Sequence, residues 1–193
     1  MLPTPSLGNP LQKMEIRFDG LQNAGGLRTV NGARFGMTRN GGSRPHQGVD
    51  LYAAPGTPVF AVADGVVELV RHADPNYGRD ILIRFRLGIG WQRVLRAAGS
   101  GDADRVLFAE YAHLSSLLVK TGDNVRRGQM IGATGTSGNA DQRYPHLHFE
   151  LRKVASPGVG HAGMLNRINP ELVFQSIDFS KPVEAMDRWS RTA

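Results

Sequence analysis

Residues 144–151 have the sequence YPHLHFEL, in which two histidines stand one residue apart within an apolar run. In an extended strand successive side chains point to opposite faces, so His146 and His148 share one face while Leu147 and Phe149 share the other. One face is therefore suited to core packing and the other to imidazole chemistry. The whole chain has six histidines, so two in one strand mark this stretch as a candidate site.

The composition favours a β-rich fold. The 193 residues are 40% hydrophobic and 21% charged, as expected for one globular domain with short appendages. Twenty-four glycines and eleven prolines indicate many tight turns. Runs such as RDILIRFRL (79–87) and RVLFAEYAHL (105–114) are typical of strands, and turn pairs separate them from their neighbours. We therefore expect a mainly antiparallel β-sheet core rather than a helical bundle.

Three local patterns complete the expected secondary structure. The pair Asn31-Gly32 is typical of a type I′ hairpin turn between two strands. The segment NPELVF (169–174) predicts a short helix, with Asn169 as its N-cap and Pro170 in its first turn. The segment PVEAMDRWS (182–190) is a second candidate helix near the C-terminal end.

A long connection, from about residue 87 to 104, separates the two strand-like runs. Loops of this length in a compact domain are usually functional or disordered. Its Trp91, Arg93 and Arg96 are candidates for the wall of a substrate groove. A surface excursion without function is the alternative.

The charge and the absence of cysteine limit the partners and the chemistry. A net charge of +6 and a pI near 10.2 favour an anionic partner, such as nucleic acid, a membrane surface or an acidic wall polymer. The arginines are scattered without a recognition motif, which argues against nucleic acid. No run approaches the roughly 20 apolar residues that span a bilayer, and no signal peptide is visible. Without cysteine there are no disulfides, thiolate metal sites or cysteine nucleophiles.

A candidate metal site combines this strand with an earlier motif. His46 and Asp50, in HQGVD, lie four residues apart, an even step that puts both on one side of an extended segment, although Gly48 permits a bend. The motif alone is common by chance, and paired histidines also occur on wet strand faces. His46, Asp50 and one of the two strand histidines together form an N, N, O donor set, which suits catalytic zinc with an open fourth position.

His113 lies near the end of the expected strand 105–114. Taken alone, it is most simply a hydrogen-bonded surface histidine. Beside a hydrolytic zinc ion, however, some group must move a proton from water and stabilise an oxyanion, and imidazole can do both near neutral pH. His72 and His161 lie in turn-like surroundings without partner motifs, and we expect both to be solvated.

Three segments together resemble the lysostaphin/LytM-type zinc endopeptidases, which cut peptidoglycan cross-bridges. They are RFGMTRNGGSRPHQGVDLYAAPGTPVFAVADGVVELV (34–70), YAHLSSLLVKTGDNVRRGQMIGATGTSG (111–138) and PHLHFEL (145–151). The resemblance implies an antiparallel β-sheet core with a substrate groove and short helices at the C-terminal end. It implies one Zn²⁺ per chain, with His46, Asp50 and His148 as ligands and with His113 and His146 as the non-ligand catalytic histidines.

The same resemblance implies action on peptidoglycan, an anionic polymer, in the periplasm or the extracellular cell wall. A trimmed signal, release by a phage and delivery as an effector all remain open, as does a cognate inhibitor or immunity protein as partner. One departure is Arg84, which stands near a position where members often carry a histidine. We expect an N-terminal segment packing on the core (1–33), a zinc endopeptidase domain (34–155) and a C-terminal appendage (156–193).

Two other functions are compatible with parts of the sequence. A catalytically silent module of the same fold would bind the cell wall or activate another hydrolase, but the chain keeps all five key side chains. Lipoyl- and biotin-carrier domains share the glycine-rich turn phrases. Lys120 lacks the flanking methionines that a carrier lysine would have, which argues against that interpretation.

Overall fold

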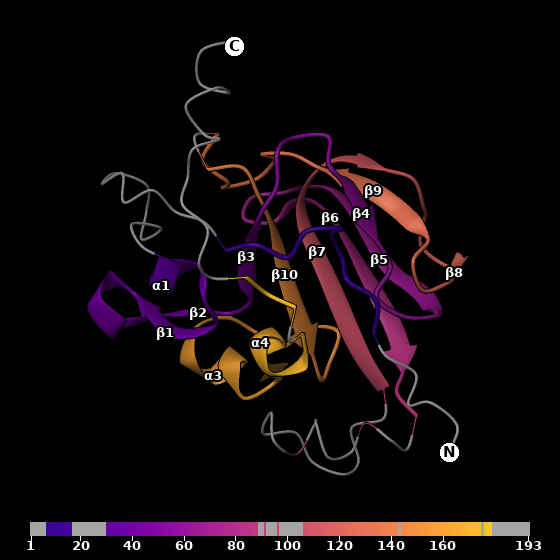
Figure 1. The fold of residues 1–193 in the computed structure, drawn as a ribbon. Helices are drawn as coiled ribbons and strands as arrows, with labels where there is room; N and C mark the ends of the chain where they lie inside the picture. Colours follow the sequence, from indigo (N-terminus) through magenta and orange to yellow (C-terminus); the bar gives the residue numbers. More distant parts are fainter. Residues whose placement is uncertain are drawn as a thin grey trace.

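The computed structural model describes residues 7–16, 30–88, 91, 96, 106–142, 144–174 and 176–178. Within these residues, nine strands form the main sheet and two form a small separate sheet (Figure 1). The main sheet comprises β3 (Val49–Tyr52), β4 (Pro58–Phe60), β5 (Gly65–Asp74), β6 (Gly78–Arg86), β7 (Val106–Leu117), β8 (Asn124–Val125), β9 (Met130–Thr134), β10 (His146–Arg152) and β11 (Arg167–Ile168). The small sheet pairs β1 (Gly36–Arg39) with β2 (Arg44–His46).

The strands of the main sheet follow the order β11-β10-β7-β6-β5-β8, with β3 on β10, and β9 on both β4 and β7. Every pairing among them is antiparallel. The predicted antiparallel β core is confirmed.

Strand β10 separates the core from the polar residues, as its alternation predicts. Leu147, Phe149 and Leu151 are fully buried in the hydrophobic core. The ring of Phe149 packs edge-on against Tyr111 of β7, with centroids 5.3 Å apart, and against Phe174, at 5.5 Å. Burying a side chain of this size contributes about 1.5–3 kcal/mol. This apolar face fixes the opposite one, so the histidines of β10 have a rigid base.

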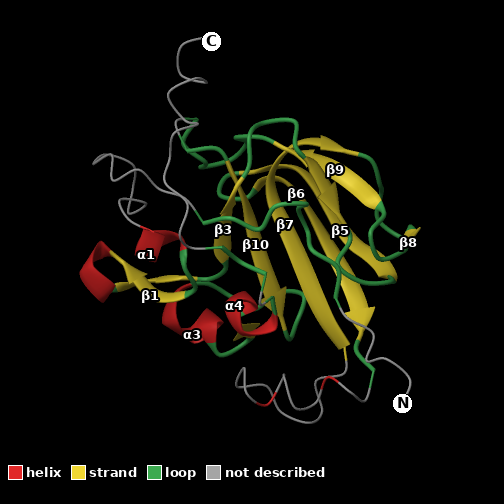
Figure 2. Ribbon diagram, in the orientation of Figure 1, coloured by secondary structure: helices red, strands yellow, loops and turns green. Residues whose placement is uncertain are grey.

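The described helices are short and lie at the side of the main sheet where β3, β10 and the small β1–β2 sheet are (Figure 2). They are α1 (Val30–Ala33), the 3₁₀ turn η1 (Asn40–Gly42), α3 (Gly160–Met164) and α4 (Pro170–Val173). Helix α4 confirms its prediction, since the Asn169 side chain accepts a hydrogen bond from the Glu171 backbone N–H at 2.9 Å. The hairpin predicted at Asn31-Gly32 is wrong, because this pair lies within α1. Ala33 at the end of that helix is fully buried, so packing outweighs the local turn preference.

Both ends of the described chain contribute to the core. Leu11, Met14 and Ile16 pack there from the N-terminal side, and Ile168 and Phe174 from the C-terminal side. The boundaries expected at residues 33 and 155 remain predictions.

The long connection after β6 is described only in part. Trp91 is buried in the hydrophobic core and Arg96 is exposed, whereas Arg93 lies outside the described residues. The candidate helix at 182–190 also lies outside them.

A bend at Gly48 brings the two halves of HQGVD to the site. His46 ends β2, whereas Asp50 lies in β3, which pairs with β10 so that Asp50 stands directly opposite His148. A Cβ atom on Gly48 would overlap the carbonyl oxygen of Phe149. Only glycine therefore lets the chain pass this close to β10.

Candidate metal centre

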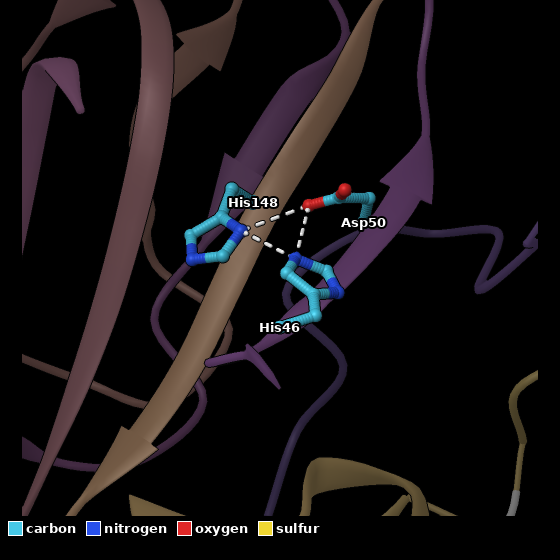
Figure 3. A group of neighbouring side chains, drawn as sticks. All are labelled: His46, Asp50 and His148. Carbon is cyan, nitrogen blue, oxygen red and sulfur yellow. Dashed lines mark hydrogen bonds and ion pairs between the residues drawn. The ribbon is translucent and has the colours of Figure 1, made fainter. Parts of the chain in front are cut away.

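His46, Asp50 and His148 converge on one point (Figure 3). Their facing atoms form a small triangle: His148 Nδ1 lies 2.8 Å from Asp50 Oδ1, His46 Nε2 lies 3.1 Å from the same oxygen, and the two nitrogens are 3.2 Å apart. All three side chains are buried. The three residues come from β2, β3 and β10, so the fold joins groups up to 102 positions apart in the sequence.

This donor set fits a zinc ion. Tetrahedral zinc with bonds of about 2.0–2.2 Å holds its donor atoms about 3.3–3.6 Å apart. The observed triangle needs to widen by only roughly half an ångström to meet that geometry. Two imidazoles and one carboxylate are ligands that zinc accepts in catalytic sites, where the fourth position is left to water or substrate.

Hydrogen bonds to the far ring nitrogens aim both imidazoles at this point. His46 Nδ1 lies 3.0 Å from the Arg34 carbonyl oxygen, and His148 Nε2 lies 2.9 Å from Glu150 Oε1. Each oxygen is an acceptor, so the ring nitrogen facing it carries the hydrogen. The lone pairs of His46 Nε2 and His148 Nδ1 are thereby left for a metal.

His113 and His146 flank the triangle. Their rings meet edge to face with centroids 4.9 Å apart, and His146 Nε2 lies 3.6 Å from Asp50 Oδ1. His146 Nδ1 donates to the Tyr144 carbonyl at 2.6 Å, and His113 Nδ1 donates to the Ser137 carbonyl at 2.9 Å. In the neutral form of each ring, Nε2 is therefore an acceptor. The fold brings all five predicted site residues together.

A sequence model of Peptidase family M23 matches residues 44–170, about two thirds of the chain. The chain belongs to peptidase family M23. The match includes all five predicted site residues, and it confirms the resemblance to lysostaphin/LytM-type endopeptidases.

Two curated relatives are each similar to more than half of the chain. The peptidoglycan DD-endopeptidase ShyA of Vibrio cholerae is 36% identical over 107 residues, which are 55% of this chain and 20% of ShyA. The glycyl-glycine endopeptidase ALE-1 of Staphylococcus capitis is 38% identical over 111 residues, 58% of this chain and 25% of ALE-1. The match thus spans about a fifth to a quarter of the length of these relatives.

A solved structure supports the fold independently. Helicobacter pylori Csd3 superposes with a TM-score of 0.52 and 23% identity, over 95% of this chain and 36% of Csd3. Among the helices of the described residues, none has the length and apolar character to cross a bilayer.

The backbone of His113 adopts an unusual conformation. Its φ is 64°, in the left-handed region that few residues other than glycine and asparagine occupy. The His113 N–H donates to the Tyr77 carbonyl at 2.8 Å, which helps to hold this conformation. Such residues cost about 1–3 kcal/mol and cluster at functional sites. In this M23 chain the unusual backbone directs the His113 ring toward His146.

Arg39 is a site residue that the sequence pattern missed. Its Nη2 donates to Asp50 Oδ2 at 2.5 Å, and its Nε donates to the Gly32 carbonyl at 3.0 Å. The guanidinium thus occupies one carboxylate oxygen and leaves Oδ1 to face the histidines. Burial opposes ionisation of Asp50, but the attraction of His46, His146 and Arg39 outweighs it and holds the carboxyl pKa well below its usual range. Asp50 is therefore an anion at neutral pH.

Glu150 was also missed, although a signal for it was present. It stands two residues after His148 on the same strand, so the alternation that pairs His146 with His148 also puts Glu150 on their face. The structure confirms this placement, since Glu150 contacts His148 Nε2. Tyr77, whose hydroxyl donates to the same Glu150 oxygen at 2.8 Å, carried no sequence signal.

The remaining predictions on single residues concern the surface. His72 and His161 are both exposed, as expected. Arg84 is exposed and pairs with Glu68 on the neighbouring strand at 2.9 Å.

Burial keeps two site histidines neutral. It lowers the pKa of His46 to about 4 and that of His113, next to His146 and His148, to about 3. Burial disfavours a charged His148 as well, but hydrogen bonds to Asp50 and Glu150 outweigh this and raise its pKa. At neutral pH, His46 can bind a cation and His113 can accept a proton.

We expect the metal-free protein to lose stability steeply in acid. An unfolded histidine has a pKa near 6.5, so between about pH 6.5 and pH 3 the unfolded chain binds protons that folded His46 and His113 do not. The free energy of unfolding should therefore fall as pH drops through this window, by an amount on the order of several kcal/mol. Urea unfolding with a chelator, at steps from pH 7 to pH 4, measures the slope.

Two variants calibrate that slope. His72→Gln removes an exposed histidine and should leave the slope of the unfolding free energy against pH unchanged. His113→Asn should make that slope shallower. Equal slopes in all three proteins would contradict the assignment of acid lability to His113.

Proposed function

We propose that this M23 chain is a zinc-dependent endopeptidase that hydrolyses cross-bridges or stem peptides of bacterial peptidoglycan. The observation that carries the proposal is the triangle of His46, Asp50 and His148 donor atoms, with two further imidazoles beside it. ShyA and ALE-1, both named as endopeptidases, are each similar to more than half of the chain. The site of action proposed is the periplasm or the extracellular cell wall.

In this proposal His46, Asp50 and His148 hold one Zn²⁺. The ion, when bound, supplies Lewis acidity toward a water molecule and toward the carbonyl of the scissile bond. The carboxylate of Asp50 balances part of the ion's charge, and Arg39 on its other oxygen keeps it turned toward the histidines.

His113 and His146 are the general base and acid for the proton of the attacking water. Because each ring donates Nδ1–H to a backbone carbonyl, each presents only a lone pair toward the site while neutral. One of them accepts the proton of the attacking water at Nε2. The resulting N–H can then stabilise the developing oxyanion or protonate the leaving amine. Two rings in contact let one carry this proton while the other stays neutral.

The positive charge of the chain supports a wall polymer as substrate. A formal charge of +6 attracts anionic peptidoglycan and concentrates the protein there.

A catalytically silent wall-binding or hydrolase-activating module is the alternative function. Loss of a ligand would favour it, but the described site keeps three donors and both flanking histidines.

The test measures metal and activity in one preparation. We expect about one zinc per chain, clearing of purified sacculi, and loss of clearing on chelation that added zinc restores. His46→Ala should abolish both zinc retention and clearing. Clearing that survives chelation and His46→Ala would remove the zinc mechanism. Zinc-loaded protein that binds sacculi without releasing new peptide termini, read by mass spectrometry, would favour the silent module.

A further inference from the structure

One short C-terminal segment, residues 167–171, reaches the acceptors that orient both proposed histidine ligands. It contains β11 and the start of α4, and it lies more than 15 residues beyond the last ligand in the sequence. Arg167 contacts the acceptor of one ligand, and Glu171 contacts the residue that supplies the acceptor of the other.

The first connection runs through Glu150, which is fully buried and has both oxygens occupied. Its Oε1 accepts from His148 Nε2 at 2.9 Å and from the Tyr77 hydroxyl at 2.8 Å. Its Oε2 accepts from Arg152 Nε at 2.7 Å and from Arg167 Nε at 2.8 Å. Two charge-assisted bonds on one side thus fix the oxygen that meets His148 on the other.

The second connection runs through the backbone at residues 34 and 35. Glu171 Oε1 accepts from the Phe35 N–H at 2.9 Å, and Glu171 Oε2 accepts from Arg34 Nη2 at 2.7 Å. These bonds fix the position of the Arg34 side chain and of the peptide unit that contains the Arg34 carbonyl. That carbonyl is the acceptor for His46 Nδ1.

We propose that residues 167–171 are a positioning segment for the metal: Arg167 acts through Glu150 on His148, and Glu171 acts through the Arg34 carbonyl on His46. Each connection fixes a hydrogen on the far ring nitrogen, so the near nitrogen offers its lone pair to the ion. The inference rests on the proposed function and extends it to residues that do not touch the metal. Acceptors behind metal-bound histidines typically change affinity by about 10–100-fold when they are altered.

Glu150→Gln is the sharpest test of the first connection. The arginine bonds to Oε2 are charge-assisted, so a glutamine places its carbonyl oxygen there and turns its NH₂ group toward His148. His148 Nε2 must then accept rather than donate, which puts the ring hydrogen on Nδ1, where the metal should bind. We expect zinc affinity, measured by competition with a chromophoric chelator, to fall about 10–100-fold.

Glu110→Gln is the matched control. Glu110 pairs directly with Glu150 across β7 and β10, is equally buried, and contacts the same Arg152 at 2.6 Å. Burial and a hydrogen bond with Asp80 raise its pKa well above the usual range, which favours the neutral acid that glutamine mimics. This variant should bind zinc as the unaltered chain does.

Glu171→Gln tests the second connection at a side chain that is 8% exposed. It weakens the hold on Arg34 and should lower zinc affinity by a smaller factor than Glu150→Gln. Its control is Glu68→Gln, which also removes the carboxylate partner of an exposed arginine, Arg84. Thermal unfolding with chelator present verifies that each variant is folded.

A second measurement distinguishes an effect on the orientation and tautomer of His148 from a general loss of stability. Ring ¹⁵N shifts of the metal-free full chain report which nitrogen carries hydrogen. We expect His148 Nε2 to be protonated in the unaltered chain and in Glu110→Gln, but not in Glu150→Gln. Failure of the unaltered chain to bind zinc would overturn the proposed function itself. Zinc binding that is equal in Glu150→Gln, Glu171→Gln and their controls would overturn only the positioning segment.

Discussion

Replacing Asp50 with asparagine is expected to abolish zinc binding and to lower peptidoglycan hydrolysis by at least about 10³-fold. Asp50 is the one anion in the proposed ligand set, and its Oδ1 faces both ligand histidines at 2.8 and 3.1 Å. An amide carries no charge to balance the ion. Its NH₂ group must also face one of two sides. Toward Arg39 it meets another hydrogen-bond donor, and toward the ring nitrogens it blocks the metal position.

The control for this variant is Asp80→Asn. Asp80 is also fully buried and also binds an arginine, since Arg71 Nη2 donates to its Oδ2 at 2.6 Å. Both variants remove a buried charge beside a guanidinium, so both should destabilise the fold. Only Asp50→Asn should lose zinc, measured by metal analysis after gel filtration. If the Asp50→Asn variant retains stoichiometric zinc, Asp50 is not a ligand.

The site could be predicted largely because it depends on a strand. The two-residue period of residues 146–151 puts His146 and His148 on one face whatever the rest of the chain does. The antiparallel pairing then puts Asp50 directly opposite His148. The same period extends to Glu150, so its place on the polar face also follows from the sequence. The role of Glu150 in orienting His148 does not follow from the sequence, because it depends on the arginines that bind its other oxygen.

What the sequence could not provide comes from long-range contacts without a local pattern. Arg39 reaches Asp50 only because η1 and the β1–β2 pair fold the chain back. Glu171 meets Arg34 across 137 positions of sequence. The hairpin expected at Asn31-Gly32 failed for a related reason, since a dipeptide signal is worth less than burying Ala33 in the core.

Replacing His113 with asparagine is expected to lower turnover of the zinc-loaded protein about 10²–10⁴-fold, while zinc affinity stays close to its original value. The reason is that His113 contacts His146 and is not one of the three proposed ligands, and its low pKa, about 3, leaves Nε2 unprotonated at neutral pH. Asparagine tolerates the left-handed backbone at φ 64°, so the variant removes the imidazole without forcing the chain to rearrange. Initial rates on purified sacculi at matched zinc content give the measurement.

Two companion variants separate catalysis from backbone strain. His113→Ala should lose as much activity as His113→Asn but unfold more easily by about 1–2 kcal/mol, because alanine is strained in that conformation. His146→Ala should lose a similar factor. Since the two rings would share one proton, the double variant should be little slower than either single one, as found when residues act as a unit. Losses that multiply instead would mean that His113 and His146 act in separate steps, and a His113→Asn enzyme of full activity would exclude His113 from the chemistry.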